Sequence, residues 1–153
     1  MKNLNKLLIA LVLPLFLNCS NDDGTDGSGI ADGHLAGTVF DTPFEAEGGI
    51  AYETEDGLFI HITNVVADCE SNTDDFTYSI YTTIPNAEVS HHQDVIVNFS
   101  KIDAVPVNDP NALVSIVARS FASNPTLGVK VKANANEGNT VEGYIRIPLC
   151  IEE

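Results

Sequence analysis

From residue 34 onward, apolar and polar side chains alternate over short segments with a period of two. This period is typical of half-buried β-strands, because successive side chains point to opposite faces. No segment shows a sustained helical period, and Gly, Pro, Asn and Asp clusters separate the segments. The pattern predicts strands at about 34–40, 44–54, 58–66, 76–84, 94–100, 112–121, 128–133 and 141–150.

The predicted connections are polar. A hairpin turn is expected at 55–57, a loop carrying Cys69 at 67–75 and another loop at 85–93. Residues 101–111 contain two prolines and are expected to cross between two sheets. Short strands with such spacing favour an all-β fold, an antiparallel β-sandwich of about eight strands. The alternative with the same pattern is a closed calycin-like β-barrel.

The first residues have a different pattern. Residues 1–6 contain two lysines and no acid, and an uninterrupted apolar run of 11 residues follows at 7–17. A membrane-spanning helix needs roughly 20 apolar residues, so this run is too short to cross a bilayer. Its length fits the apolar region of a secretory signal. The sequence therefore predicts a signal peptide over 1–18.

The end of this segment, Leu17-Asn18-Cys19, resembles the lipobox of bacterial lipoproteins. The resemblance implies that Cys19 is diacylated on sulfur and becomes the first residue of the mature chain. Asn18 departs from the family, which usually has Gly, Ala or Ser there. The alternative is an ordinary secretory signal with an unmodified Cys19.

The residues after Cys19, Ser20-Asn21-Asp22-Asp23, resemble the export tract of Bacteroidetes-type surface lipoproteins. The short acidic tether, the β-domain and the terminal Pro-Leu-Cys strand are also similar to that group. The resemblance implies an outer-membrane lipoprotein at the cell surface, with the periplasmic face as the alternative. Residues 19–33 are predicted to form a flexible acidic and Gly-rich tether, and 34–153 a single β-domain.

Charge narrows the choice of partner. After residue 18 the chain has five basic residues against 22 acids, a formal charge of −17. Such a chain repels phosphate backbones, so no nucleic-acid partner is expected. Anionic lipid also repels it, which leaves the acyl group as the membrane anchor.

Three cysteines remain to be assigned. If Cys19 is acylated, Cys69 and Cys150 are left as a pair, and in an exported protein such a pair usually forms a disulfide. Two free thiols in a metal site are the alternative, but neither has a His or a second Cys nearby in the sequence. We therefore expect a disulfide and no metal.

Few residues indicate a binding site. Adjacent His91 and His92 are suggestive, but neighbours on an extended strand point to opposite faces, which favours a solvated segment over a metal site. Tyr52, Tyr81 and Tyr144 have the amphipathic rings of a sugar-binding platform, and cross-strand packing is the alternative interpretation.

Signs of catalysis are lacking. The chain contains no Gly-x-Ser-x-Gly elbow and no phosphate-binding loop between a strand and a helix. We predict no catalytic residue and no cofactor. The favoured function is a monomeric, membrane-anchored lipoprotein with a non-catalytic β-domain that binds an envelope protein or glycan. The alternative is a small-ligand carrier of calycin-like type, and a hydrolase is disfavoured.

Overall fold

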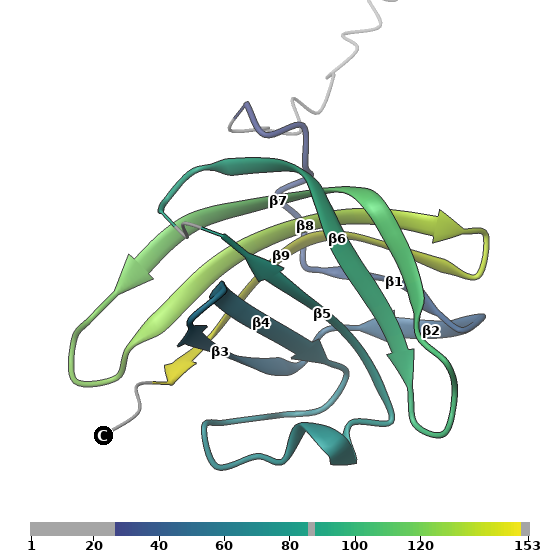
Figure 1. Cartoon of the computed structure of the whole chain (residues 1–153), viewed down its shortest axis with the longest axis horizontal. Helices are drawn as coiled ribbons and strands as arrows, with labels where there is room; N and C mark the ends of the chain where they lie inside the picture. The colour runs from purple at the N-terminus through teal and green to yellow at the C-terminus, as the bar shows by residue number, and fades with distance from the viewer. Residues whose placement is uncertain (1–26, 86–87, 151–153) are drawn as a thin grey trace, which may run out of the picture.

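The computed structural model describes residues 27–85 and 88–150 of the chain. The predicted signal peptide and Cys19 lie outside these residues. The described part is built almost entirely of strands, with one short 3₁₀ turn (Figure 1). The elements are β1 (Ala36–Val39), β2 (Thr42–Glu45), β3 (Gly48–Thr54), β4 (Gly57–Thr63), η1 (Thr73–Asp75), β5 (Tyr78–Ile84), β6 (His91–Lys101), β7 (Val107–Ser120), β8 (Thr126–Asn136) and β9 (Asn139–Cys150).

Seven of these strands close into a barrel. Their order is β9-β3-β4-β5-β6-β7-β8, and a long antiparallel ladder between β8 and β9 completes the ring. All neighbours are antiparallel except β3 and β9, which are parallel over Ala51–Leu149 and Tyr52–Cys150. The strands β1 and β2 extend from the ring beside the first half of β9. The all-β prediction is confirmed, and the closed barrel, given as the alternative to a sandwich, is the architecture observed.

The barrel interior is filled by apolar side chains. Ile60, Ile80, Val97 and Val129 are buried there, on the faces that the alternation predicts. The interior cavity lined by Ile60, Ile80 and Val97 measures about 10 Å³. A single water needs roughly 10–15 Å³, so this cavity has no room for an organic ligand. The interior is a core and holds the strands in register.

Several predicted boundaries differ from those in the structure. The strand expected at 44–54 is two strands, because the chain changes partner between them: Ala46 N–H donates to Leu35, and Glu47 N–H donates to Thr63. The loop expected at 85–93 ends early, since β6 begins at His91. Most of the crossover expected at 101–111 is a hairpin, because β7 begins at Val107 and its proline lies at an irregular register.

The folded part begins before His34. Ile30, expected in the flexible tether, is only 1% exposed. Ala31 N–H donates to Glu142 at 3.1 Å, and Asp32 forms an ion pair with Lys130. A buried apolar side chain, a hydrogen bond and an ion pair therefore hold this polar segment on the barrel. We call residues 30–35 the N-terminal strap, which crosses the outer wall formed by β8 and β9.

The strap requires a glycine beneath it. Gly143 has φ of 137°, and a Cβ there would lie 2.5 Å from the His34 carbonyl oxygen. Gly143→Ala is therefore expected to lower the free energy of unfolding by about 2 kcal/mol, because it combines backbone strain with a clash against main chain. Urea unfolding measures the loss. Gly33→Ala is the control, since its Cβ meets nothing within 4 Å. Equal stability of the two variants would contradict the prediction.

Candidate functional site

Five ring side chains gather on the outer wall formed by β3, β4 and β5. Tyr52 on β3 pairs with Phe59 on β4, and His61 on β4 pairs with Tyr81 on β5. Alternation turns these four outward, while Ile60 between them points into the core. Phe76, from the connection between β4 and β5, packs on His61. We call these five side chains the aromatic cluster.

Phe59 lies at the centre of the cluster. Its ring centroid is 5.0 Å from Tyr52, 6.2 Å from Tyr81 and 5.8 Å from His61. These separations lie within the range of favourable aromatic contacts. Tyr52, Phe59 and Tyr81 are half-buried, whereas His61 and Phe76 are buried. The cluster is thus closed at one end and presents three rings to solvent at the other.

His61 forms the closed end. Its side chain is only 8% exposed. Its Nε2 lies 2.8 Å from the Ser79 hydroxyl, and its Nδ1 has no hydrogen-bond partner among the described residues. Burial lowers the pKa of His61 to about 4, although the nearby Asp74 carboxylate opposes this shift. The ring is therefore neutral near pH 7 and serves as part of the packing.

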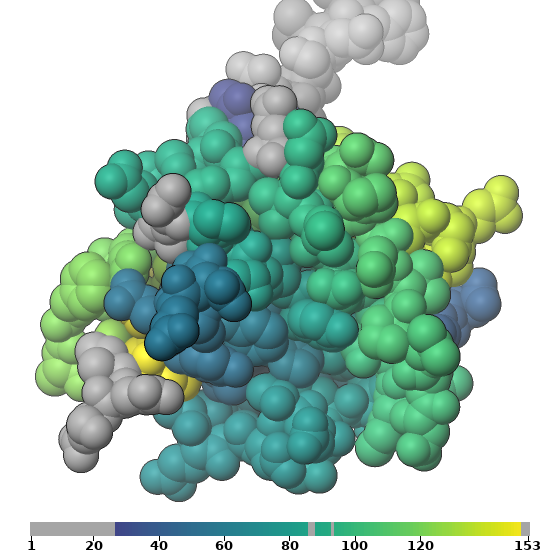
Figure 2. Space-filling view, in the orientation of Figure 1, coloured from purple at the N-terminus to yellow at the C-terminus, as the bar shows by residue number. Residues whose placement is uncertain are grey.

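A disulfide holds the connection over this wall. Residues 64–77 join β4 to β5, and Cys69 among them is bonded to Cys150, as predicted. Cys150 pairs with Tyr52, so the bridge fixes the connection at the edge of the cluster. Gly48 permits close approach at the other end, because a Cβ there would lie 2.5 Å from Ala67 N. Figure 2 shows this face, with β3 and β4 in blue beside the teal connection.

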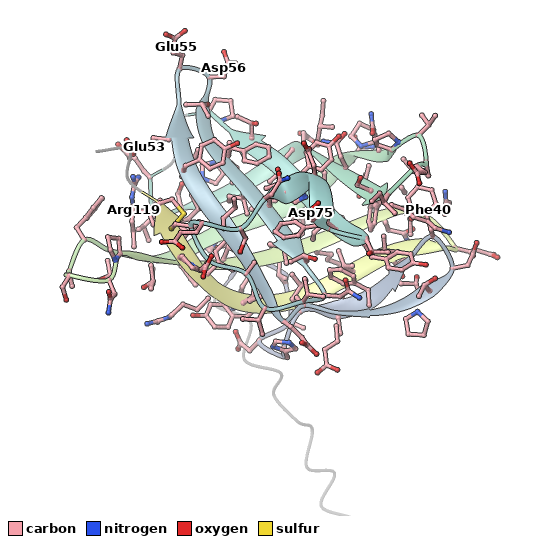
Figure 3. All side chains as sticks on the ribbon, turned by 90° about the horizontal axis from the view of Figure 1, so that it is seen from below. Phe40, Glu53, Glu55, Asp56, Asp75 and Arg119 are labelled. Atoms are coloured by element: carbon pink, nitrogen blue, oxygen red, sulfur yellow. A yellow bond between two sulfur atoms is a disulfide. The ribbon has the colours of Figure 1, made fainter. Side chains whose placement is uncertain are left out.

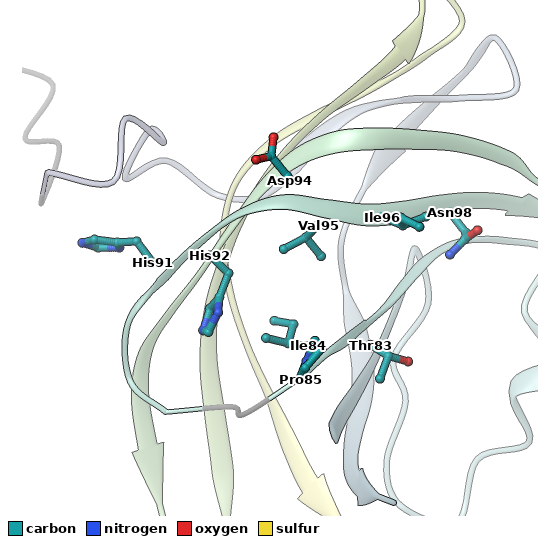
Figure 4. A pocket seen from close by; sticks show the side chains of 9 residues that line it. All are labelled: Thr83, Ile84, Pro85, His91, His92, Asp94, Val95, Ile96 and Asn98. Atoms are coloured by element: carbon teal, nitrogen blue, oxygen red, sulfur yellow. The ribbon is translucent and has the colours of Figure 1, made fainter. Parts of the chain in front are cut away.

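Beside the cluster, β5 and β6 diverge around an open cleft of about 750 Å³ (Figure 4). One side is lined by Thr83, Ile84 and Pro85. The other is lined by His91, His92, Asp94, Val95, Ile96 and Asn98. Because Asn98 pairs with Tyr81, the cleft adjoins the exposed end of the aromatic cluster.

The adjoining end of the barrel is acidic. Glu55 and Asp56 stand at the tip of the hairpin between β3 and β4 (Figure 3). Glu53 on the same hairpin forms an ion pair with Arg119 at the end of β7. Glu88, three residues before β6, and Asp94, within β6, are also exposed. Negative charge therefore surrounds the open side of the site.

The structure brings together part of the predicted site. Tyr52 and Tyr81 share one cluster, and His92 lines the adjoining cleft (Figure 4), with its Nε2 3.1 Å from the Ser90 hydroxyl. His91 points away and its Nδ1 lies 2.7 Å from the Ser115 hydroxyl. Tyr144 lies apart, on β9 opposite Lys130 of β8, where Arg146 Nε donates to its hydroxyl. Phe59 was missed as a site residue, although the alternation had placed it on the same face as His61.

Within residues 27–85 and 88–150, no group of three or more His, Cys, Asp or Glu side chains is arranged to hold a metal ion. The same part of the chain has no helix with the length and apolar character needed to cross a membrane. In comparisons with known proteins, no family model, curated protein or solved structure matches this chain.

Proposed function

We propose that this chain is a lipid-anchored outer-membrane lipoprotein whose barrel is a non-catalytic module that binds a neutral glycan at the cell surface. The observation that carries the binding proposal is the group of exposed rings, Tyr52, Phe59 and Tyr81, beside an open cleft. Half-exposed tyrosines offer an apolar face for a sugar ring and a hydroxyl that remains in water. Thr83 and Asn98 at the cleft supply hydrogen-bonding groups next to these rings.

Charge supports a neutral ligand. The chain carries 22 acids, and the acids nearest the site, Glu55, Asp56 and Asp94, make no ion pair with any described residue. A polymer rich in phosphate, sulfate or carboxylate would be repelled by this field. A small carrier ligand is less favoured, because the interior cavity lined by Ile60, Ile80 and Val97 measures only about 10 Å³.

The position of the strap supports presentation away from a membrane. The strap crosses β8 and β9, and β5 lies three strands away from each of them around the ring. Tyr81 is therefore on the wall opposite the strap. A lipid on Cys19 would attach the barrel from the strap side, with the aromatic cluster directed outward.

The binding proposal is tested by affinity electrophoresis of the chain through gels containing neutral or acidic polysaccharides. We expect retardation by a neutral polysaccharide, and a weakening of about tenfold in Tyr52→Ala and Tyr81→Ala, because ring truncation removes a central contact. Phe121→Ala is the matched control, since Phe121 is 68% exposed at the turn between β7 and β8. Unchanged retardation of a Tyr52→Ala/Tyr81→Ala double variant would overturn the proposal, and capture of an envelope protein instead would replace it.

The anchoring proposal is tested separately. Cys19→Ala is expected to move the protein from the membrane fraction to the soluble fraction, because acyl chains contribute about 0.8 kcal/mol per buried CH₂ to membrane binding. Fractionation followed by immunoblotting measures the change against the parent protein. Retention of the Cys19→Ala variant in membranes would contradict a lipid anchor.

A further inference from the structure

The ladder between β5 and β6 stops before either strand ends. Their pairing covers four residue pairs, from Tyr78–Lys101 to Tyr81–Asn98. Beyond Tyr81, β5 continues to Ile84 and remains paired only with β4. On the other side β6 continues back to His91 and remains paired only with β7. Two strand edges therefore face each other across the cleft.

The phase of the ladder identifies the groups that face the cleft. Ile102 N–H donates to the Thr77 carbonyl, which marks a hydrogen-bonded pair. In an antiparallel ladder such pairs recur at every second residue, so Thr83 and Ile96 occupy the corresponding positions beyond Tyr81. Their main-chain groups point into the cleft without pairing to each other. Only the Ile96 carbonyl is occupied there, by the Thr82 hydroxyl at 2.8 Å.

The cleft beside these edges suits side chains of an extended segment. Ile84 and Val95 provide an apolar floor, and Ile96 is 55% exposed at the rim. No lysine or arginine is among the described residues that line the cleft, whereas the exposed Asp94 of β6 lines it and the exposed Glu88 lies three residues before β6. Unpaired main-chain groups at a strand edge bind the backbone of an extended peptide, and the acidic side chains favour a peptide with positive charge.

We propose that the β5–β6 cleft is a second binding site, which takes an extended basic peptide segment of a partner protein by strand addition. The peptide backbone pairs with the open edge of β6 at the Ile96 N–H, and its lysine or arginine side chains face Asp94. Both proposed ligands adjoin the same cleft, but the peptide pairs with the main chain of β6, whereas the glycan rests on the rings of Tyr52, Phe59 and Tyr81, so each is tested by its own variants.

The probe is a labelled octapeptide of alternating lysine and valine with blocked ends, titrated against the full-length chain by fluorescence anisotropy. We expect saturable binding, together with slower amide exchange at residues 82–84 and 95–97. Ile96→Pro is expected to weaken binding about fivefold or more, because it removes a donor that faces the cleft and takes no part in the ladder with β7. Ile96→Ala keeps that donor and is the matched control.

Two further arms separate strand addition from charge attraction. A peptide of the same charge with proline replacing valine cannot form a strand, and we expect it not to bind. Asp94→Asn removes the charge with a residue that tolerates the φ of 55° at this position, and it is expected to weaken binding of the lysine–valine peptide. Equal binding of the proline peptide, or equal affinity of the Ile96→Pro and Ile96→Ala variants, would overturn the proposal. Tyr81→Ala is expected to weaken glycan binding alone, so failure of one site is distinguishable from failure of the other.

Discussion

Replacing Cys69 and Cys150 with serine is expected to lower the free energy of unfolding by about 4 kcal/mol. The two residues are 81 positions apart, so the bridge closes a long loop and removes many conformations from the unfolded chain. A domain of this size has a total stability of roughly 5–15 kcal/mol, so the variant loses a large part of it. Urea unfolding of the oxidised protein, the reduced protein and the double variant measures the effect.

The loss is expected to be greatest in the connection 64–77. This segment contributes one side chain, Phe76, to the aromatic cluster, and its Val65 and Val66 are exposed. Without the bridge to the end of β9, Phe76 is the buried apolar side chain that holds the described segment on the wall. Hydrogen exchange in 64–77 should accelerate more than exchange in β8. A variant that loses less than about 1 kcal/mol would show that packing alone fixes the connection.

The faces of the strands were predictable, whereas the closure of the sheet was not. On β4 the alternation separated Ile60 and Ile62 from Phe59 and His61, and the structure places the first pair in the core and the second outside. The same alternation arises in a sandwich and in a barrel, because each strand has one buried face in both. Closure depends on β8 and β9 pairing along their whole length, which is a long-range property.

The sequence predicted which type of residue forms the site, namely tyrosine, but only in part which tyrosines lie together. Tyr52 and Tyr81 meet because both pair with β4, while Tyr144 lies on β9 opposite a different neighbour. Strand pairing decides which tyrosines meet, and it cannot be derived from alternation within single strands. Phe76 was expected within a strand, but it lies just before β5 and covers His61 from outside.

His61 is expected to make the protein less stable as the pH falls from 7 to 5, by about 2 kcal/mol. Its pKa is about 4 in the folded protein and 6.5 in the unfolded chain. Above pH 6.5 the ring is neutral in both states and this contribution is complete. Between 6.5 and 4 the unfolded chain gains a proton that the folded protein excludes, so stability falls with pH. Below pH 4 both states are protonated and the loss stops, at about 3 kcal/mol in total.

His61→Gln isolates this effect, because glutamine does not titrate and retains a group able to bond to the Ser79 hydroxyl. The variant is expected to be less stable than the parent at pH 7, since it loses the ring contacts with Phe59 and Phe76. Between pH 7 and 5, its free energy of unfolding should nevertheless fall by about 2 kcal/mol less than that of the parent, because the contribution of His61 is absent. The carboxylates titrate in both proteins and cancel in the difference.

His34→Gln, which removes an exposed histidine outside the cluster, should keep the pH dependence of the parent's stability. If the free energy of unfolding of the parent and of His61→Gln fell equally with pH, His61 would be protonated in the folded protein as easily as in the unfolded chain. The closed end of the aromatic cluster would then be open to water.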